Sequence, residues 1–198
     1  MIIGITGSLA SGKSTVLKVL SSKKYSSFSA DVFVRRLYKK IKFRKLISKS
    51  LKIEVKGNFK QKIKNILIND PKNIKILEKK SHPFVRKEML SFIKKNRSKK
   101  KIFLEIPLLV ERDLSRHFDK TIFISCPRKT RLKRYLGLGG DRRVFNILDK
   151  RQASFKRKKK YCDLHIVNNK SISLLKKKLI SIFKNYDWDF SRYRNNWS

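Results

Sequence analysis

The stretch GITGSLASGKST, residues 4–15, decides the fold of this 198-residue chain. Three of the seven glycines in the protein fall within it, at Gly4, Gly7 and Gly12. Gly7 to Ser14 fits the pattern G-x-x-x-x-G-K-S/T at every fixed position. In such a loop the backbone N–H groups surround phosphate oxygens, and glycine permits the dihedral angles and the close approach that this requires. The stretch therefore predicts a site for a nucleoside triphosphate.

The residues on either side of the loop supply the context that this mechanism needs. MIIGIT before it predicts a buried strand, and the apolar residues from Val16 to Leu20 have helical spacing. The positive end of that helix favours phosphate. We expect Lys13 to reach the β- and γ-phosphates and Ser14 to ligate Mg²⁺. The residues expected to bind the nucleotide are Gly7, Ala10, Ser11, Gly12, Lys13, Ser14 and Thr15.

Further along the chain, predicted strands alternate with predicted helices. Strands are expected at residues 1–6, 25–31, 101–111, 120–126 and 163–169. This alternation predicts a single α/β domain over residues 1–198, with a parallel five-stranded sheet flanked by helices, the P-loop kinase fold. Residues 41–100 predict a mostly helical insertion with breaks at 57–58, 70–71 and 82–83, and residues from about 131 to 152 a glycine-hinged lid.

Composition leaves two function classes open. The chain has 53 Lys and Arg against 14 Asp and Glu, a net charge of +39. The excess is spread from end to end, which favours compositional drift at exposed positions over selection for a polyanion partner. We therefore expect the lysine runs at 156–160 and 176–178 to be solvated helix faces. The alternative is a basic nucleic-acid-binding protein with a vestigial P-loop; otherwise nucleic-acid binding is expected to be only non-specific.

The cysteines, the histidines and the length of the apolar runs indicate the compartment in which the protein is expected. Cys126 and Cys162 form no CxxC pair, and we interpret both as free thiols of a reducing compartment. The three histidines lack metal-ligand spacing, and no apolar run reaches the length of about 18 residues that a membrane span needs. We expect a cytoplasmic protein with no membrane association, and the pattern implies no particular oligomeric state. The aromatic C-terminal residues 186–198 are expected to dock on the domain.

Asp31 ends the second predicted strand, beside the phosphate loop in a parallel sheet. A carboxylate at this edge can accept the proton of an attacking hydroxyl and help to order Mg²⁺. Alternatively, Asp31 caps a helix that begins at Val32. The local pattern leaves both roles open. The sequence has no D-x-x-G strand end and no N-K-x-D, which disfavours a GTPase, and a small-molecule kinase fits the short chain better than a motor ATPase.

Five blocks occur in one order: IIGITGSLASGKST, SADVFVRRL, SHPFVR, EIPLLVE and CDLHIVNN. They span residues 2–169, and their combination resembles the dephospho-CoA kinase family. That family shows a D-A-D strand end followed by an arginine, an H-P-x-I/V-R step and a D-x-P-L-L-x-E strand. The resemblance implies transfer of the γ-phosphoryl group of ATP, with Mg²⁺, to the ribose 3′-hydroxyl of dephospho-CoA to give coenzyme A. The alternative within the fold is a nucleoside or nucleotide kinase.

Residue by residue, the resemblance implies that Asp31 is the catalytic base and acts with Lys13. Arg35, His82 and Arg86 would bind the acceptor substrate, the last two from the 41–100 insertion. The chain departs from the family at three places. Ser29 stands at the first aspartate of D-A-D, Glu105 stands where aspartate is more usual, and the lid carries GLGGDRR in place of a second arginine near Arg134. We expect Arg142, or its neighbour Arg143, to supply the lid cation that contacts ATP.

Overall fold

The computed structural model describes residues 1–185, and it confirms the predicted α/β architecture. Five parallel strands form one sheet in the order β2-β3-β1-β4-β5. The strands are β1 (Ile2–Gly7), β2 (Ser26–Ser29), β3 (Ile102–Glu105), β4 (Lys120–Ser125) and β5 (Leu164–Val167). All five coincide with predicted strands, although β3 ends six residues early. The aromatic residues 186–198, expected to dock on the domain, lie outside the described residues.

The register brings the functional ends of the strands to one edge of the sheet. Gly7 at the end of β1 pairs with Ile124 of β4, and Ser29 at the end of β2 pairs with Glu105 at the end of β3. Because the strands are parallel, the loop after β1 and the helix after β2 leave the sheet in the same direction. The candidate residues of both segments therefore lie at the carboxyl edge.

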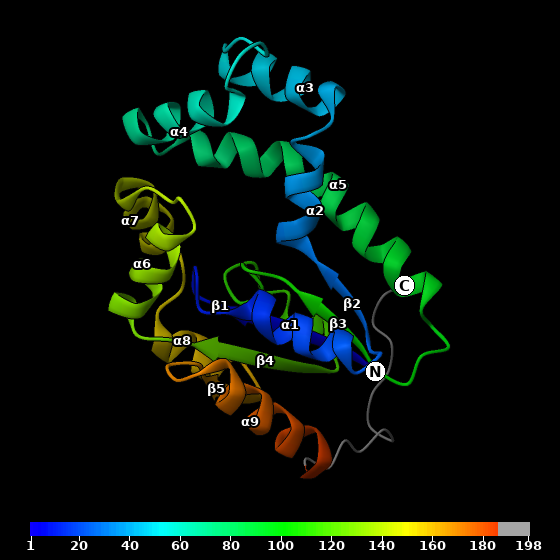
Figure 1. Cartoon of the computed structure of the whole chain (residues 1–198). Helices are drawn as coiled ribbons and strands as arrows, with labels where there is room; N and C mark the ends of the chain where they lie inside the picture. The colour runs from blue at the N-terminus through cyan, green and yellow to red at the C-terminus, as the bar shows by residue number, and fades with distance from the viewer. Residues whose placement is uncertain (186–198) are drawn as a thin grey trace.

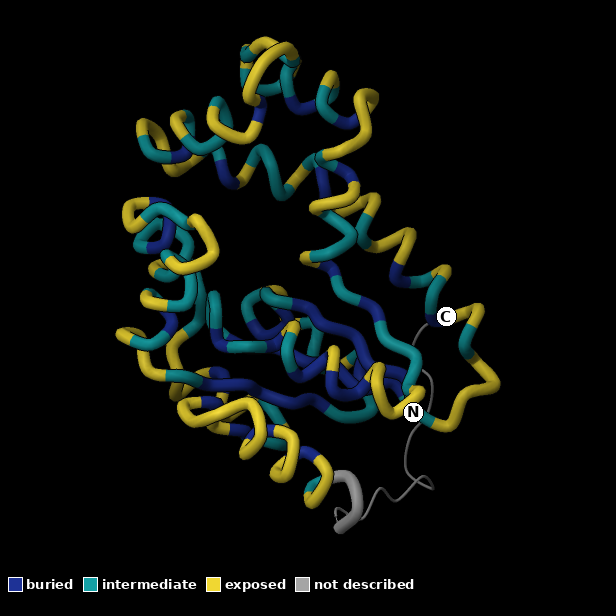
Figure 2. The backbone as a smooth tube through the Cα atoms, in the orientation of Figure 1, coloured by how far each residue is buried: buried dark blue, intermediate teal, exposed yellow. Residues whose placement is uncertain are grey.

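Apolar residues on both sheet faces are covered. On one face, α1 (Lys13–Ser22) and α9 (Ile172–Asn185) contribute Val16, Leu20, Leu175 and Leu179 to a core that includes alternate residues of β1 and β4. On the other, Met89 and Ile93 of α5 (Asn73–Lys95) pack with residues of β2, β3 and the loop after β3. The short helix α8 (Phe155–Lys160) lies against β4 through Phe123 and Phe155. Figure 2 shows the three central strands, β1, β3 and β4, as the most continuously buried part of the chain.

The helical insertion has its own small core above the sheet. After α2 (Ala30–Leu37), the chain forms α3 (Ile41–Leu51) and α4 (Phe59–Asn69), which pack with the first half of α5 (Figure 1). Leu37, Phe43, Ile47 and Phe59 are buried together there. The separate core explains how α3, α4 and the first half of α5 project from the sheet, whereas the second half of α5 packs on it.

The predicted break at residues 82–83 is wrong, because α5 continues through Pro83. An internal proline removes one helical hydrogen bond and costs about 3 kcal/mol. Partly buried Leu77 before it packs on the core of the insertion, and buried Met89 and Ile93 after it pack against the sheet, so both halves of the helix have apolar partners. Tertiary packing thus outweighs the local preference of the His-Pro pair. The other predicted breaks are confirmed, since α4 begins at Phe59 and ends at Asn69.

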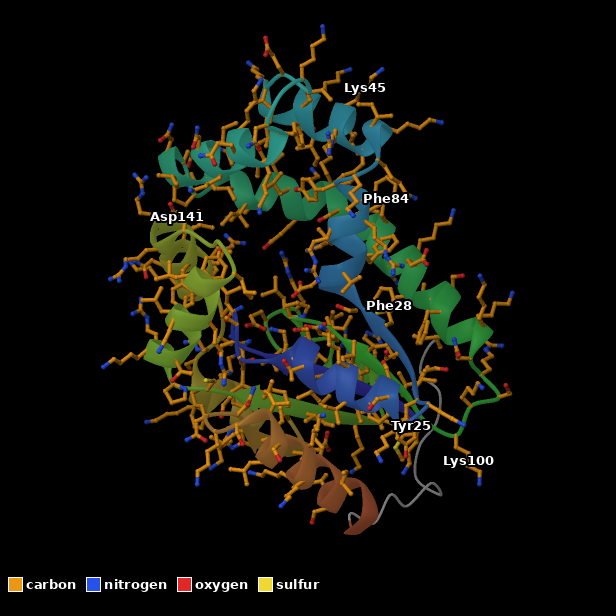
Figure 3. All side chains as sticks on the ribbon, viewed as in Figure 1. Tyr25, Phe28, Lys45, Phe84, Lys100 and Asp141 are labelled. Atoms are coloured by element: carbon orange, nitrogen blue, oxygen red, sulfur yellow. The ribbon has the colours of Figure 1, made fainter. Side chains whose placement is uncertain are left out.

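Two helices form the segment that the sequence predicts as a lid. They are α6 (Arg128–Gly137) and α7 (Arg142–Lys150), joined by a glycine-rich turn in which Gly139 has a φ of 75°. Asp141 caps α7 through the backbone N–H groups of Arg143 and Val144. It also forms a 3.0 Å ion pair with Lys64 of α4, and Figure 3 labels Asp141 where α7 approaches the insertion. The lid segment and the insertion are therefore in contact.

Between β3 and β4 the chain forms one turn of 3-10 helix, η1 (Ser115–His117). Over the described residues, none of the helices is both long and apolar enough to span a membrane. Cys126 and Cys162 are free thiols, as predicted. The prediction of a solvated face at residues 156–160 holds for four side chains and is wrong for Lys158, which is fully buried. An ion pair with Glu111, 2.9 Å long, makes this burial possible.

Candidate active site

The phosphate loop has two positions that only glycine can occupy. A Cβ on Gly7 would lie 2.4 Å from the carbonyl oxygen of Ile124. Gly12 has a φ of 97°, and a Cβ there would lie 2.1 Å from Nδ2 of Asn168. That Asn168 nitrogen donates a 2.8 Å hydrogen bond to the carbonyl of Ser11, so it cannot easily move away. Both fixed glycines of the sequence pattern are therefore required by close contacts on the outer side of the loop.

The interior of the loop presents donors to an anion. Lys13 is buried, and its Nζ donates to the carbonyl oxygens of Gly7 at 3.1 Å and Ser8 at 3.2 Å. Helix α1 begins at Lys13 with neither a side-chain cap nor an acidic residue in its first turn. The buried hydroxyl of Ser11 has no hydrogen-bond partner among residues 1–185. An ammonium, an uncapped helix N-terminus and an unsatisfied hydroxyl together fit a triphosphate.

The remaining loop residues lie around this cradle. Ala10 takes a left-handed conformation with a φ of 58°, and Ser14 and Thr15 form the first turn of α1 after Lys13. Ser14 is exposed at the helix start. Its hydroxyl can contribute one ligand to Mg²⁺, an ion that commonly takes few protein ligands and completes its coordination with phosphates and water. Residues 1–185 contain no group of three or more His, Cys, Asp or Glu placed to hold a metal.

Asp31 lies in the first turn of α2, directly after β2. The helix begins at Ala30 and not at Val32, because the hydroxyl of Ser29 accepts the backbone N–H of Val32 at 3.2 Å and caps it. The alternative role of Asp31 as the cap is therefore wrong. Asp31 is exposed at the carboxyl edge of the sheet, and its carboxylate remains available for chemistry.

Ser29 also links β2 to β3. Its hydroxyl donates a 2.5 Å hydrogen bond to Oε2 of Glu105, whose residue is only 2% exposed. Burial raises the pKa of Glu105, and the nearby charge of Asp31 raises it further. The hydrogen bond from Ser29 and the charges of Lys13 and Arg35 act in the opposite direction. The strand register puts Glu105 beside Ile5 of β1 and Ser29 of β2, so Lys13, Asp31 and Arg35 follow strands that adjoin Glu105, near enough for their charges to act on it.

His82 and Arg86 lie elsewhere on the insertion. His82 lines a pocket of about 620 Å³ between α5, the loop after β3 and the end of α7. Burial lowers the pKa of His82, while nearby Glu78 opposes that shift. Glu78 accepts ion pairs from Arg112 at 2.7 Å and Arg151 at 3.0 Å. Arg86 is exposed one turn farther along α5 and does not line this pocket. Neither residue is among the charges that act on Glu105.

The lid segment places a different arginine at the phosphate loop. Arg142, the residue selected from the sequence, is exposed as the first residue of α7. Arg134 of α6 instead donates from Nη1 to the carbonyl oxygen of Asn168 at 3.2 Å, and the same atom lies 3.8 Å from the position of a Cβ on Gly12. Arg134 and Asn168 were not selected as site residues. The sequence could have indicated both residues, because Asn168 follows the last strand at the carboxyl edge of the sheet and Arg134 lies on the helix before the glycine turn.

Comparisons with known proteins agree with this geometry. The sequence model of the family described as dephospho-CoA kinase matches residues 1–173. A dephospho-CoA kinase of Rickettsia typhi is 33% identical over 186 residues, covering 93% of this chain and 97% of the relative. One from Bartonella henselae is 32% identical, covering 92% of this chain and 96% of the relative.

Solved structures show the same architecture. TT1252 from Thermus thermophilus matches with a TM-score of 0.71 and 26% identity, covering 94% of this chain and 97% of that one. A dephospho-CoA kinase from Campylobacter jejuni matches with a TM-score of 0.59 and 26% identity, covering 92% and 95%. A shikimate kinase from Acinetobacter baumannii, 12% identical with a TM-score of 0.53, shares the fold over 94% of each chain. On its sequence and on the arrangement of its phosphate loop, the chain belongs to the dephospho-CoA kinase family.

Proposed function

We propose that this protein transfers the γ-phosphoryl group of ATP to the ribose 3′-hydroxyl of dephospho-CoA, giving coenzyme A and ADP. The observation that carries the proposal is the grouping of Lys13, Asp31, Arg35 and Glu105 beside a phosphate loop. A cation and an exposed carboxylate at the carboxyl edge of a parallel sheet supply the two functions that phosphoryl transfer to a hydroxyl requires.

The loop binds and orients the triphosphate. Backbone N–H groups at the start of α1, the hydroxyl of Ser11 and the ammonium of Lys13 neutralise the phosphate oxygens. Ser14 would hold Mg²⁺, which spreads and neutralises charge on the β- and γ-phosphates when bound. Glu105 is buried next to this point, so we expect it to act through water or through Ser29 rather than by direct metal ligation.

Asp31 acts as the general base. Its carboxylate accepts the proton of the acceptor hydroxyl as that oxygen forms a bond to the γ-phosphorus, and the bond from phosphorus to the β,γ-bridging oxygen breaks to release ADP. Arg35, four residues farther along α2, would contact the anionic acceptor. The cation of Lys13 stabilises the charge that develops on the transferring group.

The flanking segments would enclose the reaction. We propose that residues 41–100, including His82 and Arg86, form the acceptor side and that residues 131–152 form the lid. Within the lid we expect Arg134 to meet the nucleotide close to Gly12, with Arg142 reaching ATP only if the glycine turn moves. The cytoplasmic location also remains a prediction.

An acceptor panel tests the proposal. The purified protein is incubated with Mg²⁺ and ATP together with dephospho-CoA, a nucleoside, a nucleoside monophosphate or shikimate, and products are identified by mass. We expect one added phosphoryl group on dephospho-CoA alone. Phosphorylation of a nucleoside in its place would support the alternative kinase. Strong, salt-dependent nucleic-acid binding without any phosphorylated product would support the nucleic-acid alternative.

A further inference from the structure

The peptide groups of Leu9, within the phosphate loop, are held from both sides by the lid segment. The backbone N–H of Leu9 donates a 2.8 Å hydrogen bond to Oε1 of Gln152. The carbonyl oxygen of Leu9 accepts from Nη1 of Arg131 at 3.3 Å. These contacts join residues that are more than a hundred positions apart in the sequence. They are the contacts by which α6 and the end of α7 reach the outer side of the loop.

We call the two hydrogen bonds of Leu9, to Gln152 and from Arg131, the clamp. The clamp acts on the residue directly before Ala10, the strained residue of the loop. Ala10 has a φ of 58°, a conformation that side chains other than glycine avoid. Such a residue keeps its conformation only when its surroundings hold it there. The loop's internal hydrogen bond from the Ser11 N–H to the Ser8 carbonyl closes the turn around Leu9 and Ala10. Hydrogen bonds that hold both peptide groups of Leu9 therefore also hold this turn, and the turn sets the direction of the backbone N–H groups that follow it.

Both clamp residues are themselves held in place. Arg131 is only 8% exposed, and it donates to the carbonyl of Cys126 at 3.1 Å and to Asp149 of α7 at 2.5 Å. The residue after Gln152, Ala153, donates its N–H to Oε1 of Glu111 at 2.8 Å. Glu111 is in turn the partner of buried Lys158. The segment that carries Gln152 is thus linked, through Ala153, to the ion pair between Glu111 and Lys158.

We propose that Gln152, supported by Arg131, is a positioning residue that preorganises the phosphate loop for the nucleotide. This inference rests on the proposed function only in requiring that the loop binds ATP. The side-chain oxygen of Gln152 holds the Leu9 N–H, so that the N–H groups of Gly12, Lys13 and Ser14 are left to bind phosphate. The two contacts of the clamp fix the base of the lid segment to the loop.

Equilibrium binding of Mg-ATP, measured by calorimetry without any acceptor, tests the proposal. Gln152→Leu removes the acceptor at similar volume and is expected to weaken ATP binding about tenfold, because the loop loses a hydrogen bond and a part-buried N–H is left unsatisfied. Gln152→Glu keeps an acceptor and should stay within about threefold of the original affinity. The matched control is Gln61→Leu, since the side-chain amide of Gln61 on α4 donates to Asn65 of its own helix.

The thermal midpoint without nucleotide shows whether each variant is folded. Should Gln152→Leu fail to fold, Gln152→Asn retains polarity but is one methylene too short to reach Leu9, and it should show the same loss of affinity. Wild-type affinity in a folded Gln152→Leu or Gln152→Asn variant would overturn the proposal. So would an equal loss in Gln152→Glu. Because ATP binding is the readout, a wrong assignment of the acceptor substrate leaves this result intact.

In steady-state assays the same variants should raise the KM for ATP and leave the KM for the acceptor unchanged. A purely structural role would instead lower the active fraction and leave both KM values as they were. An increase in both KM values would contradict a role confined to the phosphate loop.

Discussion

Replacement of Lys158 by methionine tests how the segment behind the phosphate loop is held together. Lys158 is 0% exposed, and its ammonium lies 2.9 Å from Oε1 of Glu111. The other carboxylate oxygen of Glu111 is buried and makes no hydrogen bond within residues 1–185. In Lys158→Met the carboxylate, whose side chain is 12% exposed, loses its charge partner and keeps the N–H of Ala153 as a hydrogen-bond donor. The variant keeps most of the apolar stem of the side chain, is one atom shorter, and removes the charged ammonium.

The expected effect follows from the burial of the pair. Removing one member of a buried ion pair typically costs about 3–5 kcal/mol, because an unpaired charge remains in the interior. For a chain of this size, 1 kcal/mol shifts Tm by about 2–4 °C, so Lys158→Met should lower Tm by about 6–20 °C. The double variant Lys158→Met/Glu111→Gln removes both charges and keeps an acceptor for Ala153. It should recover most of that loss.

Thermal and urea unfolding at pH 7 measure these differences. The matched control is Lys156→Met, which makes the same substitution at an exposed position of the same helix and should change stability by less than about 0.5 kcal/mol. Equal Tm values for Lys158→Met and Lys156→Met would refute the reasoning. A double variant as unstable as the single one would show that the loss comes from packing and not from the unpaired carboxylate.

Three further predictions concern the site and its surroundings. Burial raises the pKa of Glu105 in the folded protein above its value in the unfolded chain. The group therefore contributes its full stability at pH values below the unfolded pKa, where it is protonated. That contribution is lost as the pH rises through the folded pKa. Glu105→Gln should therefore raise Tm at pH 7 and raise it less at pH 4; a pH-independent difference in thermal unfolding would contradict this. Lys64→Ala breaks the partly exposed ion pair with Asp141 and should cost no more than about 1 kcal/mol in urea unfolding, whereas a loss above about 2 kcal/mol would show a stronger coupling of insertion and lid. Gly12→Ala places a Cβ 2.1 Å from a neighbouring amide nitrogen, so calorimetry should show at least about a hundredfold weaker ATP binding, and wild-type affinity would be inconsistent with the close contact.

Much of the fold follows from local patterns in the sequence. The strands of the sheet are short apolar runs, and their alternation with helical segments predicts a parallel arrangement. The phosphate loop is predictable because each fixed position has one dominant physical reason, such as the absence of a Cβ at Gly7 and Gly12. Helix, turn and helix in the lid segment are also visible, since glycines at 137–140 interrupt the helical spacing.

The features that escaped prediction depend on tertiary contacts. Helix α5 continues through Pro83 because its flanking residues pack on separate cores. Lys158 is buried in a run of lysines because Glu111 meets it from the loop after β3. Ser29 takes over the capping role that was considered for Asp31, and it also bonds Glu105 from the next strand.

The lid arginine illustrates the same limit. The sequence offers several arginines that could meet the nucleotide, and only the packing of α6 against the loop after β5 shows that Arg134 lies near Gly12. The clamp between Leu9 and Gln152 is likewise invisible in sequence, since a single glutamine carries no pattern of its own. Long-range pairs of this kind have no local signature, whereas the glycine loop does.

The central claim is that Asp31 is the base for phosphoryl transfer to dephospho-CoA. The most direct measurement is ADP release from Mg-ATP, with and without dephospho-CoA, for the wild-type protein and Asp31→Asn. The matched control is Asp113→Asn, since Asp113 is exposed and its left-handed backbone suits asparagine equally well. We predict acceptor-dependent turnover that falls about 10²–10⁴-fold in Asp31→Asn with unchanged ATP affinity. Wild-type turnover in Asp31→Asn, or ADP release indifferent to dephospho-CoA, would contradict the account.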